Sequence, residues 1–69
     1  METVSASALY SARRAILEGR ASRFYLRRLN DLIAYNATHE FMPYGTVAFV
    51  EGLINGTDRA AEGSNRTLH

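Results

Sequence analysis

The absence of cysteine constrains this chain more than any other feature of its sequence. A chain of 69 residues forms one small domain, whose core stabilises the fold by only about 3–5 kcal/mol. Small domains often add disulfides, a bound metal or a partner subunit, and the lack of thiols excludes disulfides and thiolate zinc sites. The two histidines, His39 and His69, are far apart in the sequence. We therefore expect no metal and no other cofactor, and we expect further stability to come from a partner or from self-association.

Apolar residues recur at helical spacing in three segments, and this pattern predicts an all-α, three-helix domain over residues 1–57. The three helices are expected over about residues 5–18, 21–36 and 43–55. Residues 58–69 are polar and lack an apolar anchor, so a disordered, mobile tail is expected there. No run in the sequence approaches the roughly 18 apolar residues of a membrane span, and no membrane partner is expected.

The first two helices have clear faces and boundaries. Leu9, Ala12 and Ile16 share the apolar face of the first helix, and its small alanine side chains favour close packing. Gly19 is expected to end this helix, and Ser22 is expected to cap the second one. The second helix has a broad apolar face, formed by Tyr25, Leu26, Leu29, Leu32, Ile33 and Asn36.

The third segment is open to two interpretations. Pro43 can occupy the first turn of a helix that ends at Gly56. However, residues 46–50 are rich in β-branched side chains, and each of two internal glycines costs a helix about 1 kcal/mol. We expect the helix, because a single strand has nothing to pair with unless the protein dimerises through it. One face of this helix is then formed by Val47, Val50 and Ile54, and a strip of small residues by Gly45, Ala48 and Gly52.

Charge is distributed unevenly along the chain. All eight basic residues are arginine, and six of them lie between positions 13 and 28, where Glu18 is the only acid, so that this segment carries a charge of +5. Guanidinium groups fork onto phosphate oxygens and stack on bases, which makes the cluster a candidate nucleic-acid-binding site. Its members are Arg13, Arg14, Arg20, Arg23, Arg27 and Arg28.

The absence of lysine leaves a second interpretation of this cluster open, namely a general bias toward arginine on a solvated helix face. Arg20, Arg23 and Arg27 form a ladder if the second helix begins early enough, and Arg27 can pair with Asp31 one turn later. A helix-turn-helix motif is not predicted, because the connection between the second and third segments is longer than the usual turn of about 3–4 residues.

A protein-binding surface is the function that we favour. Phe24, Arg28 and Tyr35 share one side of the second helix, away from the centre of its apolar face, and aromatic residues and arginine are enriched at interfaces. In the alternative interpretation, the aromatic side chains fill a core made shallow by alanine. The expected partner is another protein or a second copy of the chain, which can use the small-residue strip of the third helix. Nucleic acid is the alternative partner.

The sequence contains no motif of an enzyme active site. It lacks a nucleophile elbow, a phosphate-binding Walker loop, a zinc-protease motif and a dinucleotide fingerprint. His39 and Glu40 are its only adjacent histidine–carboxylate pair, and we interpret His39 as a solvated loop residue. We therefore expect a non-enzymatic regulatory protein without a small-molecule substrate, of the size of bacterial and phage accessory proteins. The first residues lack the basic and apolar regions of a signal peptide, which favours the cytoplasm.

Removal of the polar segment Thr57–His69 is expected to leave the fold intact, because this segment has little apolar surface to bury. The expected change in the midpoint of thermal unfolding is less than about 4 °C, which corresponds to less than about 1 kcal/mol in a domain of this size. Circular dichroism of the full-length and shortened chains measures this difference. A larger loss of stability on truncation would show that the segment docks on the domain.

Overall fold

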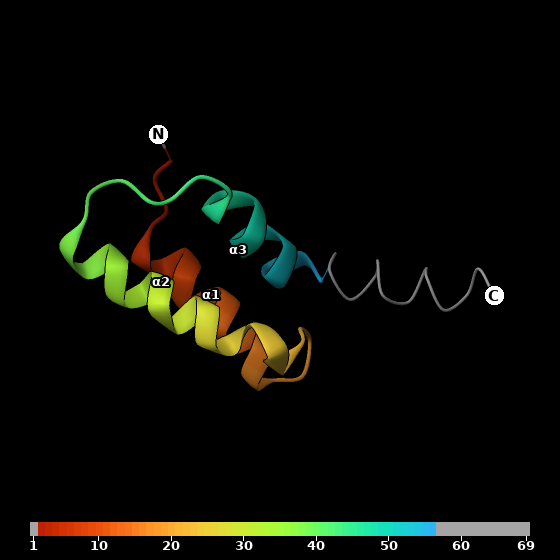
Figure 1. Ribbon diagram of the computed structural model, residues 1–69. Coiled ribbons are helices and arrows are strands. Elements are labelled where there is room, and N and C mark those ends of the chain that lie inside the picture. The colour runs from red at the N-terminus through yellow and green to blue at the C-terminus, as the bar shows by residue number, and fades with distance from the viewer. Residues whose placement is uncertain (1, 57–69) are drawn as a thin grey trace.

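The computed structural model describes residues 2–56, which form a domain of three helices (Figure 1). The helices are α1 (Ala6–Leu17), α2 (Leu26–Thr38) and α3 (Thr46–Asn55), and a 3₁₀ turn, η1 (Arg23–Tyr25), leads into α2. The all-α prediction is confirmed, including the helical state of residues 46–50. Within residues 2–56, the only β pairing is an isolated antiparallel bridge between Glu2 and Met42. The tail predicted over residues 58–69 lies outside the described residues.

Local sequence signals set both ends of α1. Ser5 is extended, and its hydroxyl accepts a hydrogen bond from the Ala8 amide at 3.1 Å. At the other end, the amides of Gly19 and Arg20 donate to the carbonyls of Ile16 and Ala15, at 3.1 and 2.8 Å. This bonding pattern needs a residue with a left-handed backbone conformation after the helix, and Gly19 adopts it with a φ of 81°. The predicted boundaries are therefore confirmed to within a residue.

The second helix begins later and ends later than predicted. The hydroxyl of Ser22 accepts a hydrogen bond from the Phe24 amide at 3.2 Å, so it caps as expected, but the element it caps is η1. The chain cannot be helical from Ala21 onward because residues 18–21 complete the turn that ends α1. No helix-breaking residue follows, so α2 continues through Thr38 until the backbone becomes extended at His39.

The predicted start of the third helix at Pro43 is wrong, because α3 begins at Thr46. Pro43 instead opens a turn, in which its carbonyl accepts from the amide and the hydroxyl of Thr46 at 3.2 and 2.6 Å. Gly45 has a φ of 92°, which a continuing helix does not allow. The predicted stop at Gly56 is confirmed. The buried face of α3 is also rotated from the predicted one, since it is formed by Thr46, Val50 and Leu53.

A side chain distant in the sequence caps the N-terminus of α3. Gly45 occupies the N-cap position and has no side chain to accept from the first amides of the helix. The Glu2 carboxylate takes this role, because its two oxygens accept from the amides of Gly45 at 2.7 Å and Val47 at 2.9 Å. These hydrogen bonds hold the pKa of the Glu2 carboxyl below its ordinary value, and the bond from the Val47 amide has the largest effect. The Glu2 carbonyl also accepts a hydrogen bond from the Met42 amide at 2.8 Å. The backbone and the side chain of Glu2 therefore both bind the chain around the start of α3.

The helix α1 lies at the centre of the domain. It packs against α2 and against α3, whereas α2 and α3 make at most isolated close approaches to each other (Figure 1). Ala12 and Ala15 are completely buried, and their small side chains let both neighbouring helices come close to α1. The predicted face of α1 is thus confirmed as part of the core, which comprises Leu9, Ala12, Ala15, Ile16, Ala21, Leu29, Leu32, Met42, Val50 and Leu53.

The substitution Glu2→Gln is expected to lower the midpoint of thermal unfolding at neutral pH, because an amide is a weaker acceptor than a carboxylate at a helix N-terminus. The pKa of Glu2 is lower in the folded chain, so the carboxylate stabilises the fold above the pKa of the unfolded chain. This stabilisation is lost as the pH falls through the folded-state pKa. Circular dichroism melts across the acid range measure the effect, and the wild type should lose more stability on acidification than the variant.

The matched control is Glu40→Gln, which removes the same charge from an exposed residue. Glu40 accepts no hydrogen bond from another residue of the described part of the chain, so its replacement should leave both the midpoint and its pH dependence close to those of the wild type. Equal behaviour of the two variants would contradict a capping role for Glu2.

Candidate functional site

An open groove of about 450 Å³ lies between the start of α2 and the length of α3. It exists because both helices pack against α1, while few backbone positions of α2 and α3 lie close to each other. The small-residue strip predicted on α3 forms one wall, and within residues 2–56 no helix covers it. We call this site the α2–α3 groove, and it is lined by Tyr25, Arg28, Gly45, Ala48, Phe49, Gly52 and Leu53.

Aromatic side chains connect the two walls of the groove. The rings of Tyr25 and Phe49 meet edge to face with centroids 5.7 Å apart, and the Arg28 guanidinium carbon lies 4.3 Å from the centroid of the Phe49 ring. Both arrangements are favourable, the first through the ring quadrupoles and the second as a cation–π contact. Arg28 makes no ion pair with any acid of the described chain. Its charge is therefore available at the wall of an otherwise apolar site.

Two highly exposed aromatic residues are sequence neighbours of residues that line the groove. Phe24 is 84% exposed, and its ring meets that of Tyr25 edge to face at 5.2 Å. Tyr44 is 97% exposed and directly precedes Gly45, which lines the groove. Apolar surface in water is unfavourable, so two exposed aromatic rings next to groove-lining residues are suited to burial by a partner.

The structure brings together two of the three predicted protein-binding residues. Phe24 and Arg28 both lie at the groove, where each contacts one of its aromatic side chains. Tyr35 does not line the groove. Its ring instead stacks on that of His39, with centroids 3.8 Å apart and planes 7° from parallel. His39 is exposed, and its Nδ1 lies 3.1 Å from the Tyr35 carbonyl.

Helical periodicity alone assigns Tyr25, Phe49 and Leu53 to the core side of their helices. In the structure, Leu53 is buried, whereas Tyr25 and Phe49 are half-buried and line the groove. Whether these two rings line a groove depends on the relative positions of α2 and α3 on α1. The apolar pattern of one helix contains no information about those positions.

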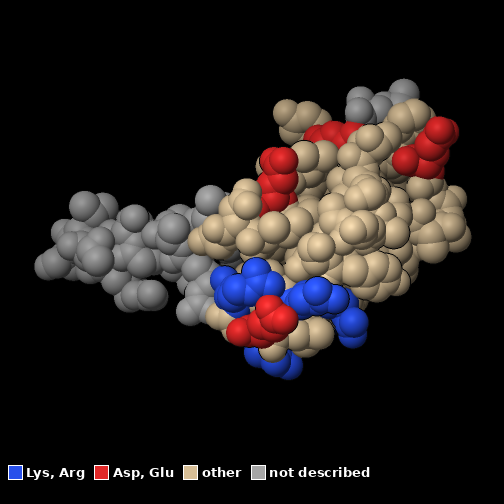
Figure 2. All heavy atoms as spheres, turned by 180° about the vertical axis from the view of Figure 1, so that it is seen from behind, with Lys and Arg blue, Asp and Glu red and all other residues tan. Residues whose placement is uncertain are grey.

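The six candidate arginines are all exposed and come from four parts of the fold. Two lie on α1, two on α2, one in η1, and Arg20 lies in the turn that follows α1. On the face shown in Figure 2, the visible basic side chains gather along one edge together with one acidic side chain, and the other acidic ones lie toward the opposite edge. Arg20 pairs with Glu18 at 2.7 Å, which is the only ion pair within residues 2–56. The predicted pair between Arg27 and Asp31 is therefore not formed.

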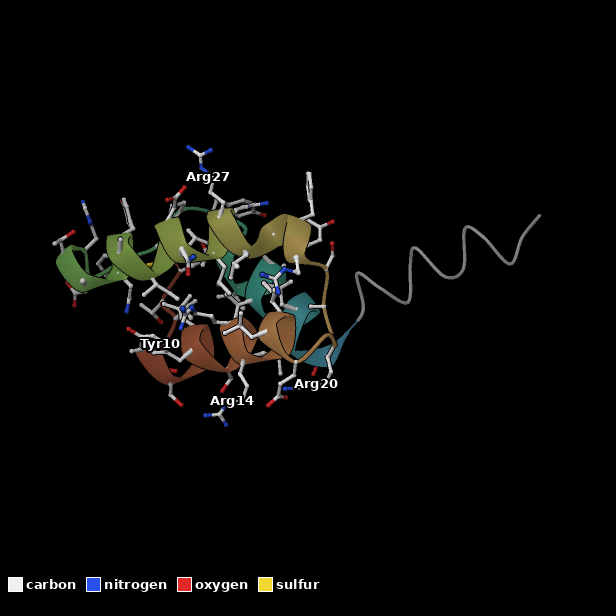
Figure 3. The ribbon with its side chains drawn as sticks, turned by 90° about the horizontal axis from the view of Figure 1, so that it is seen from below. Tyr10, Arg14, Arg20 and Arg27 are labelled. Carbon is white, nitrogen blue, oxygen red and sulfur yellow. The ribbon has the colours of Figure 1, made fainter. Side chains whose placement is uncertain are left out.

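The condition for a ladder of Arg20, Arg23 and Arg27 is not met. It requires a second helix that includes Arg20, but η1 begins only at Arg23. Figure 3 shows Arg14 and Arg20 pointing away from the α1 side of the molecule, while Arg27 points away from α2 on the opposite side. The labelled arginines therefore do not form one continuous strip.

No further site comes from metal-binding or membrane-spanning features of the described residues or from the comparison with known proteins. Within residues 2–56, no three histidine, aspartate or glutamate side chains are grouped to hold a metal ion, and none of the helices has the length and apolar character needed to cross a bilayer. No protein-family model matches the chain, and neither a curated protein nor a solved structure shows significant similarity to it.

Proposed function

We propose that this chain is a non-enzymatic protein-binding domain whose binding surface is the α2–α3 groove together with Phe24 and Tyr44. The observation that carries this proposal is the high exposure of two aromatic rings, Phe24 and Tyr44, that directly precede residues lining an apolar groove. Burying one such ring contributes about 1.5–3 kcal/mol, and aromatic residues are typical hot spots of interfaces. A regulatory role and a cytoplasmic location stay predictions from the sequence.

A second copy of the chain is the other class of partner that the sequence predicts. A small core supplies little stability, and an interface between copies would add to it. Light scattering over a concentration series separates a stable monomer from a self-associating chain.

Nucleic-acid binding is the second candidate function. It is favoured by the exposure of six arginines, five of which have no acidic partner in the described part of the chain. The opposite directions of Arg14 and Arg27 count against it, because one duplex face would meet only some of these side chains. The protein-binding proposal is the stronger one for this reason.

The substitutions Phe24→Ala and Tyr44→Ala are each expected to weaken partner binding by at least about tenfold, because each removes a ring that the partner buries. Arg14→Ala is the control on α1, and it should change the affinity by less than about threefold, since exposed charges at a distance contribute little. The partner is first captured from lysate and identified by mass spectrometry. Its affinity for each purified variant is then measured by calorimetry.

A gel-shift assay with single- and double-stranded DNA and RNA tests the competing function. The proposal predicts no shift even at low salt. A shift that weakens steeply with salt and disappears in an Arg23→Ala/Arg27→Ala variant would contradict the proposal in favour of nucleic-acid binding. Full affinity of both aromatic variants for an identified protein partner would contradict the assigned surface.

A further inference from the structure

The α2–α3 groove has the dimensions of a site for a short helix. Its α3 wall extends from Gly45 to Leu53, which at the helical rise is about 12 Å, or somewhat more than two turns. Along this wall, Gly45, Ala48 and Gly52 present little or no side chain, so the backbone of another helix can come close. A helix there would contact α2 and α3 together and complete a four-helix arrangement around the groove.

The lining of this groove contains one charge, and it is positive. Arg28 is the only charged residue among the lining residues, and it has no acidic partner within residues 2–56. Glu51, the only charged residue of α3, lines a separate hollow of about 300 Å³ together with Val4 and Ala8. A partner that covers the groove therefore removes water from an unpaired guanidinium, which is unfavourable unless the partner brings a carboxylate.

From these two observations we infer that the α2–α3 groove binds an amphipathic helix of a partner protein, with a carboxylate of that helix paired to Arg28. The inference rests on the proposed function and specifies the chemistry of its partner. The apolar side of the helix packs on Phe49, Leu53 and the small residues of α3, in the helix-in-groove mode of recognition.

Charge also argues against a second copy as the occupant. Two identical chains that pair through a twofold axis present the same patch to each other. Groove-to-groove pairing would then bring two Arg28 side chains to one interface, while no carboxylate lines the groove. A different partner with an acidic helix satisfies the same surface without this repulsion.

Selection from a phage-displayed library of helical peptides, with the purified chain as target, tests the inference. The expected winners carry apolar residues at spacings of three and four and a glutamate or aspartate beside them. For a synthetic winner, Arg28→Gln should weaken binding at least tenfold, as should replacement of the peptide carboxylate by an amide. Arg28→Glu should in turn bind a peptide that has lysine at that position better than the wild type does.

Two further variants of the chain locate the peptide. Ala48→Trp fills the groove from an exposed position of α3, and it should abolish binding while circular dichroism shows an intact fold. Arg14→Glu makes the same charge change as Arg28→Glu on α1, and it should leave the affinity within about twofold of the wild type.

Failure of the inference is distinguishable from failure of the proposed function. Winners without acidic residues, or winners that bind the Ala48→Trp variant with full affinity, overturn the inference and leave protein binding in place. A dimer that Ala48→Trp converts to a monomer also overturns it, because the occupant is then a second copy. If no peptide is enriched and no lysate protein is captured, both the inference and the proposed function are wrong.

Discussion

The packing of one face of α1 against both α2 and α3 is the constraint on which the rest of this structure depends. Ala12 and Ala15 are fully buried, and residues this small let two helices use the same central one. The consequence is that α2 and α3 are separated, and the surface between them stays open as a groove. The feature that makes the core thin therefore also creates the candidate binding site.

Because the backbones of α2 and α3 make few close approaches, the position of α3 depends mainly on α1, on the Glu2 carboxylate and on the contacts of Phe49. Glu2 binds the amides of Gly45 and Val47 with its side chain and that of Met42 with its backbone. Gly45 makes this arrangement possible, since its left-handed backbone turns the chain into α3 and its missing side chain leaves the first amides to a distant acceptor. The wall of the groove is thus held by a charged residue that lies elsewhere in the sequence.

The parts of the fold that follow from local chemistry were predictable. Gly19 and Gly56 act through their own backbone and end their helices as expected, and Ser5 caps α1 within a residue of its predicted start. Other features depend on tertiary contacts. Local sequence cannot show that Pro43 lies outside the helix, or that Glu2 supplies the missing cap. For the site, the small-residue strip and the two exposed residues Phe24 and Arg28 were predictable. The aromatic contact across the groove was not, since it requires the relative positions of α2 and α3.

The exposure of individual alanine methyl groups tests the central claim most directly. In an NMR experiment on the chain with labelled alanine methyls, a soluble paramagnetic compound broadens the signals of methyl groups that solvent reaches. We predict strong broadening of Ala48, which is exposed in the groove, and protection of Ala12 and Ala15, which are buried in α1. Protection of Ala48 in the monomeric chain would contradict an open groove, and broadening of Ala12 and Ala15 would contradict the central position of α1.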